Sequence, residues 1–159
     1  MGGGERRGIE EERVWVKTDK DANFTDALVQ NAKEDEILDK DIDEQPFEYA
    51  EFEVCQVTIV SDQQLHYELY FWSSDDFDDT DLDVDSFLGS VDLDLPVSGK
   101  QVDGAGPYRL DVEISPRVNI IDLTDSKKIY VSLVNRSATA KNTGATGEVV
   151  VTLALAPRR

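Results

Sequence analysis

Apolar and polar residues alternate with a period of two through most of the chain beyond Pro46. Alternation of this kind is typical of a strand that buries one face. The alternating runs are Phe47–Val60, Leu65–Trp72, Phe87–Leu95, Tyr108–Ile114, Val118–Leu123, Lys128–Asn135 and Glu148–Ala156. No helical segments lie between them, which excludes parallel strands joined by crossover helices. The pattern predicts an all-β fold, an antiparallel β-sandwich or jelly roll of about seven to eight strands.

The same alternation predicts which side chains face the core. Short polar links at Asp62–Gln64 and Thr124–Ser126 are typical of tight hairpin turns between neighbouring strands. The predicted inward set is Val57, Ile59, Leu69, Phe71, Val91, Leu93, Leu110, Val112, Val131, Leu133, Val151 and Leu153.

The stretch before Pro46 is polar and has few apolar residues. Arg13–Lys17 alternates and could form a first strand, and Thr25–Ala32 could form two helical turns capped by Thr25. The remainder has too few apolar residues for a core of its own. The sequence therefore predicts an extended polar N-terminal arm over residues 1–45, which docks on a neighbour, and a sandwich domain over 46–159.

Charge narrows the range of functions. The 159 residues carry a net charge of −18, and residues 41–99 hold 17 of the 34 acidic residues and no basic one. Such a chain is a poor partner for nucleic acid and for anionic membranes, so we expect neither. The abundance of aspartate over lysine is typical of halophilic proteins, although an ordinary acidic protein has the same property. We also expect no signal peptide and no membrane-spanning segment.

Residues with catalytic potential are scarce. The chain has one cysteine and one histidine, which excludes an internal disulfide and histidine-rich metal chemistry. Cys55 alternates with Val57, which predicts a buried thiol, and His66 falls on an outward position beside Glu68. No nucleophile elbow, phosphate-binding loop or zinc-protease motif occurs. The sequence therefore predicts a protein that is not an enzyme and has no cofactor, with calcium as the possible exception.

That exception comes from an acidic loop. Seven carboxylates lie within residues 75–85, between the strand ending Tyr70-Phe71-Trp72 and the segment Asp85-Ser86-Phe87-Leu88-Gly89. The arrangement resembles the calcium-binding β-sandwich domains of synaptotagmin and protein kinase C type. The resemblance implies Asp75, Asp83 and Asp85 as calcium ligands. The alternative is a solvated loop whose repulsion is screened by salt.

A second resemblance covers more of the chain. The segments Asp81–Leu95, Gly104–Val112, Ile129–Lys141 and Gly144–Leu155 are similar in style to small β-domain proteins of tailed-virus particles, which decorate capsids, form minor capsid parts or join tails. The resemblance implies a structural virion protein, located in the particle or, alternatively, in the cytoplasm.

Three hypotheses for function remain open. The first is a non-enzymatic structural protein that contacts protein neighbours and forms homo-oligomers. The second is a calcium-dependent binding module built on the acidic loop. The third is a carbohydrate-binding domain with Tyr70 and Trp72 as a stacking platform; these rings could instead pack under the arm or in a subunit contact.

Overall fold

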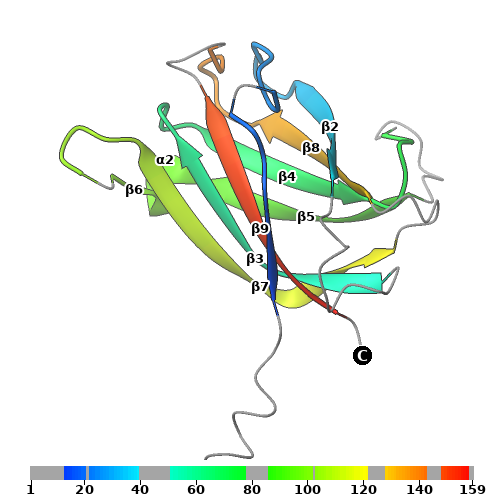
Figure 1. The fold of residues 1–159 in the computed structure, drawn as a ribbon. Coiled ribbons are helices and arrows are strands. Elements are labelled where there is room, and N and C mark those ends of the chain that lie inside the picture. The colour runs from blue at the N-terminus through cyan, green and yellow to red at the C-terminus, as the bar shows by residue number, and fades with distance from the viewer. Residues whose placement is uncertain are drawn as a thin grey trace, which may run out of the picture.

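The structure, a computed structural model, describes residues 13–20, 22–39, 51–77, 86–101, 103–121, 128–142 and 148–157. Two antiparallel sheets pack face to face (Figure 1). The first sheet has the order β1 (Val14–Lys17), β9 (Val149–Pro157), β3 (Glu51–Ser61), β7 (Tyr108–Ile121), β6 (Lys100–Gln101). The second has the order β2 (Lys33–Asp39), β8 (Lys128–Asn135), β4 (His66–Trp72), β5 (Phe87–Asp94). The predicted antiparallel sandwich is confirmed, with nine strands in the described residues.

The core lies between the two sheets and follows the alternation of the sequence. Buried members of the predicted inward set are Val57, Ile59, Leu69, Phe71, Val91, Leu93, Val131, Leu133, Val151 and Leu153. Leu110 and Val112 are partly buried and pack against them. Cys55 is buried, as predicted. No helix in the described residues is long and apolar enough to cross a bilayer.

Two connections differ from the predicted hairpins. β3 and β4 belong to different sheets, and so do β7 and β8, so each link carries the chain across the sandwich instead of reversing it within one sheet. Buried Leu65 lies in the first of these links. The turn predicted at Thr124–Ser126 lies outside the described residues. Alternation marks which residues face inward, but it does not specify the strand with which a neighbour pairs, and the hairpin prediction was therefore wrong at both places.

A short helix, α2 (Leu95–Ser98), connects β5 to β6 and so passes from one sheet to the other. Asp94 caps it, because its Oδ1 accepts a hydrogen bond from Val97 N at 3.3 Å. Gly99 ends it where a Cβ would lie 2.6 Å from Leu95 O, so no larger residue fits without a backbone shift.

The stretch predicted as an arm contributes strands to both sheets. β1 pairs with β9 and β2 pairs with β8, so the arm prediction is wrong for residues 14–17 and 33–39, whereas the first-strand alternative at Arg13–Lys17 is confirmed. No helix forms at Thr25–Ala32. Instead, the Leu28 carbonyl accepts hydrogen bonds from Asn135 Nδ2 at 3.0 Å and from Lys141 N at 2.7 Å. Residues 1–12 and 40–45 lie outside the described residues.

Candidate functional site

Of the aromatic side chains that the structure describes outside the core, most lie on the outer face of the four-stranded sheet. The strand register places Phe87, Trp72, Tyr130 and Ile37 in one row across β5, β4, β8 and β2. We call this row, together with Tyr70 and Phe77, the aromatic band. It runs from one edge of the sheet to the other.

Edge-to-face ring contacts hold the aromatic band together. The ring centroids of Trp72 and Phe87 lie 5.3 Å apart, and those of Tyr70 and Phe87 lie 5.5 Å apart. Phe77 contacts Trp72 at 6.0 Å and Tyr130 at 6.2 Å. Edge-to-face geometry at these distances is the favourable arrangement for aromatic pairs, so the band is a packed unit.

The middle of the band is buried, but its two ends are not. Trp72 is 1% exposed and Tyr130 is 5% exposed, whereas Phe87 is 44% exposed and Ile37 is 46% exposed. The Lys33 ammonium lies 5.6 Å from the Trp72 ring and donates a hydrogen bond to Phe77 O at 2.8 Å. Trp72 Nε1 donates to Ser132 Oγ at 2.9 Å, so the buried indole nitrogen is satisfied.

This burial removes the predicted stacking platform. A ring that stacks on a sugar needs an open face, and Trp72 has almost no exposed surface. The Tyr70 hydroxyl accepts a hydrogen bond from Arg136 Nη2, which also donates to Glu68 Oε1 at 2.7 Å. Trp72 is therefore packed and not open to a ligand. The groups that cover its ring, Lys33 and Phe77, belong to the same chain.

The acidic loop leaves the sheet next to the band. Its neck is closed by a hydrogen bond from Ser73 N to Ser86 O at 2.7 Å and by one from Ser86 Oγ to Asp76 O at 2.6 Å. Asp75 is exposed near this neck. Asp83 and Asp85 lie outside the described residues, so the calcium site over the three aspartates stays a prediction.

A different group of possible metal ligands lies at the other end of the same face. His66, on β4, and Asp92 and Asp94, on β5, have ligand atoms within 4.8 Å of one another. His66 Nε2 lies 2.5 Å from Asp92 Oδ1. Imidazole and carboxylate ligands together suit zinc or manganese. Ligand atoms that bind one such ion at about 2.1 Å lie closer to one another than these do, so the three side chains would have to rotate inward to bind it.

The sequence analysis placed His66 outward but missed this group. His66, Asp92 and Asp94 share the same outward parity in their strands, which is a signal in the sequence. The pairing of His66 with Asp94 depends on the register between β4 and β5, however, and the sequence does not fix it. Phe77 was likewise not singled out. Phe87 was expected on the inward face, from its parity with Val91 and Leu93, and this was wrong: the register shift between Phe71 and Trp72 pairs Phe87 with Trp72 on the outer face, where it is 44% exposed.

The chain was compared with protein families, curated proteins and solved structures. No protein-family model, no curated protein and no solved structure matches the chain.

Proposed function

We propose that the protein is a non-enzymatic structural protein that acts by contacts between copies of itself, made by the aromatic band. The observation that supports it is the exposure of both ends of the band, Phe87 and Ile37, at opposite edges of one sheet face. Exposed apolar side chains that continue a packed aromatic cluster are typical of protein interfaces rather than of solvated surface.

The second copy is the partner that fits best. A two-fold arrangement would place the same band on both copies, so that Phe87 of one could meet Ile37 or Phe87 of the other. Aromatic anchors of this kind carry much of the energy of an interface when water is excluded around them. The edge-to-face contacts that hold the band are already formed within one chain, so association loses less side-chain conformational entropy.

Charge opposes this contact in dilute salt. The chain carries −18, and carboxylates of Asp35, Glu68 and Asp92 lie on the same sheet face as the band. Salt at about 1 M shortens the screening length to roughly 3 Å, which removes most of this repulsion. We therefore expect association between copies to strengthen as the concentration of monovalent salt rises.

A virion of a tailed virus is the setting that we propose for this assembly. The support is the resemblance of four segments to small virion proteins, together with a surface suited to repeated contacts. In a preparation of the native source, the protein should then sediment with particles that contain many copies of it. Recovery as a free monomer alone would contradict the virion setting.

Sedimentation velocity on the purified protein tests the contact itself. The wild type should associate increasingly between low and high sodium chloride. Ile37→Ser and Phe87→Ser should each weaken association by about tenfold, equivalent to about 1.4 kcal/mol. Val97→Ser is the matched control, because Val97 is 79% exposed on α2, beyond the opposite end of β5. A wild type that stays monomeric at every salt concentration, or a control that weakens association equally, would refute the proposal.

A further inference from the structure

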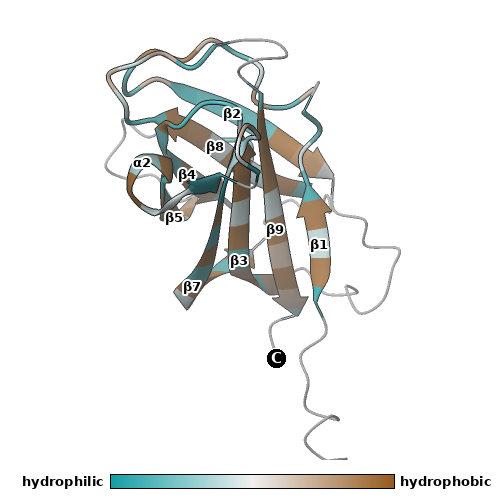
Figure 2. Cartoon of the chain, turned by 90° about the vertical axis from the view of Figure 1, so that its left-hand side faces the viewer, coloured by the Kyte–Doolittle hydropathy of each residue, from teal (hydrophilic) through white to brown (hydrophobic). Residues whose placement is uncertain are grey.

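The outer face of the five-stranded sheet carries a hollow of about 350 Å³. Figure 2 shows β7, β3, β9 and β1 side by side on the side of the molecule where it lies. Its aromatic, polar and charged lining residues are Trp15, Lys17, Gln56, Thr58, Arg109 and Thr152. They come from all four strands, so the hollow has a rigid floor.

Trp15 stands at the β1 side of this hollow. It is 55% exposed, in contrast to the buried Trp72, although an indole is among the most costly side chains to leave in water. The register aligns Trp15 with Ala154, and Ala154 with Gln56. The indole, a small residue and an amide therefore follow one another across the sheet.

The next row supplies hydroxyl and charged groups. Lys17 pairs with Thr152, which pairs with Thr58. The side chains of Lys17, Gln56 and Thr152 make no hydrogen bond or ion pair with any residue that the structure describes. These three side chains have donors and acceptors available for a ligand.

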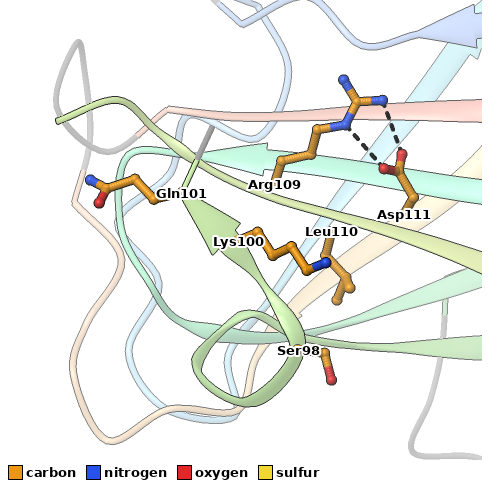
Figure 3. A pocket seen from close by; sticks show the side chains of 6 residues that line it. All are labelled: Ser98, Lys100, Gln101, Arg109, Leu110 and Asp111. Atoms are coloured by element: carbon orange, nitrogen blue, oxygen red, sulfur yellow. Dashed lines mark hydrogen bonds and ion pairs between the residues drawn. The ribbon is translucent and has the colours of Figure 1, made fainter. Parts of the chain in front are cut away.

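The opposite side of the hollow is fixed by an ion pair. Arg109 Nε and Nη2 each donate to Asp111 at 3.1 Å, and Thr58 Oγ1 donates to Asp111 Oδ1 at 2.5 Å. Figure 3 shows Arg109 and Asp111 facing each other at a second hollow of about 430 Å³, which shares Arg109 with the first. The two-pronged geometry holds the guanidinium in one orientation, which makes this side pre-organised.

We propose that this hollow binds a saccharide. The carbon-bound hydrogens on one face of a pyranose ring pack on the negative face of an indole, which assigns the ring to Trp15. Sugar hydroxyls both donate and accept, and they match the amide of Gln56, the hydroxyl of Thr152 and the ammonium of Lys17. A purely apolar ligand would cover these polar groups without giving them partners, which is costly.

The site goes beyond the structural function proposed above and does not depend on it. The aromatic band lies on the outer face of the other sheet, so the two surfaces point away from each other. A structural protein with such a site would attach its assembly to glycan-bearing surfaces. Each surface can be changed without touching the other.

The two tryptophans provide a direct assay. Acrylamide should quench exposed Trp15 and leave Trp72, which is 1% exposed, almost unquenched. The probes are hexasaccharides of β-glucose, α-glucose, α-mannose and N-acetylglucosamine, each tested up to about 10 mM, above the range of weak millimolar binding. At least one should protect Trp15 from quenching in a saturable manner and move its emission to shorter wavelength.

Variants assign the protection to the hollow. Trp15→Ala should abolish binding in calorimetry, whereas Trp15→Phe, which retains a smaller ring, should retain part of it. Gln56→Ala and Thr152→Val should each weaken binding several-fold. Phe87→Ser, on the opposite sheet, is the control and should bind as the wild type does. Emission from Trp72 reports whether each variant is folded.

Four results would overturn the saccharide proposal. The first is that none of the hexasaccharides protects Trp15. The second is that Trp15→Ala binds as tightly as the wild type. In the third, protection depends on protein concentration, which would identify a contact between copies. In the fourth, inorganic phosphate protects as well as any sugar, which would identify an anion site on Lys17 and Arg109.

Discussion

A buried pair of opposite charges connects the N-terminal stretch to the sandwich, and its removal should have a large, non-additive effect. Lys141 and Glu34 have side chains that are 0% and 4% exposed, and Lys141 Nζ lies 3.9 Å from Glu34 Oε2. Lys141 Nζ also donates to Phe24 O at 2.6 Å, and Asp26 N donates to Glu34 Oε1 at 3.1 Å. Glu34 is the first acidic residue of β2, so the pair fixes the edge of the four-stranded sheet.

The cost of burial is visible in both groups. Desolvation raises the pKa of Glu34 above its ordinary value, although the Asp26 hydrogen bond and Lys141 oppose the shift. Desolvation lowers the pKa of Lys141, although Glu34 opposes that shift. Each charge is therefore tolerated because the other is present. Removal of one partner from such a pair costs about 3–5 kcal/mol, since the remaining charge stays buried.

A double-mutant cycle tests this reasoning. Lys141→Met and Glu34→Gln should each lower the free energy of unfolding by about 3–5 kcal/mol. The double variant leaves no buried charge, and the amide oxygen at position 34 can still accept from Asp26 N. It loses mainly the hydrogen bond from Lys141 Nζ to Phe24 O, and the unpaired buried carbonyl costs about 1–3 kcal/mol. It should therefore lose only about 2 kcal/mol, and the coupling between the two sites should reach about 4 kcal/mol or more.

Urea unfolding at constant ionic strength is the assay, because guanidinium would itself screen charge. Lys20 and Glu148 provide the matched control: their charged groups lie 3.6 Å apart, and the Lys20 side chain is 59% exposed. The same substitutions there should change stability by less than about 1 kcal/mol. Additive losses in the Lys141–Glu34 cycle, or equal losses in both cycles, would refute the reasoning.

Two further predictions concern pH and calcium. Burial raises the pKa of Tyr67 to about 12, so the folded protein favours the neutral phenol. The resulting contribution to the free energy of unfolding is fully present below pH 10 and is lost as pH rises toward 12. Two pKa units correspond to about 2.7 kcal/mol, so urea titrations between pH 9 and 11.5 should show a steeper loss for wild type than for Tyr67→Phe; parallel losses would contradict this. For the acidic loop, sodium should raise the melting temperature as much as calcium does at equal ionic strength, and replacement of Asp75, Asp83 and Asp85 by Asn should slightly stabilise the protein at low salt. A calcium-specific rise that follows mass action and is lost in the triple variant would instead support the calcium module.

The interior of the sandwich could be predicted from the sequence because burial imposes alternation on every central strand. Leu69 and Leu133, for example, were assigned to the core from their parity alone, and both are 0% exposed. The two edge strands of the N-terminal stretch, β1 and β2, carry this signal only weakly. The buried apolar residue of β1 is Val16, at 8% exposure, and that of β2 is Leu38, at 5% exposure; β2 also buries the charged Glu34. The sequence of a strand with so few buried apolar residues resembles that of a polar arm, and only its pairing with a neighbouring strand shows that it belongs to the sheet.

The two proposed functional surfaces were less predictable than the core, because each depends on residues far apart in the sequence. The aromatic band joins Ile37 to Phe87, and the hollow joins Trp15 to Arg109. Tyr70 and Trp72 were selected because two aromatic rings on one face of a strand suggest an open platform. The chain covers Trp72 with Phe77, which comes from the start of the acidic loop, and parity carries no information about such a cover.

The distribution of charge separates the two proposed surfaces in a way that experiment can use. The face with the aromatic band also carries Asp35, Glu68 and Asp92, so association through it must overcome like charges and should respond strongly to salt. The hollow is lined by Lys17 and Arg109, and a neutral sugar gains little from either charge beyond hydrogen bonds. Saccharide binding should therefore change little over the salt range in which self-association increases. If both respond to salt in parallel, occupancy of the hollow depends on assembly, and the two surfaces do not act independently.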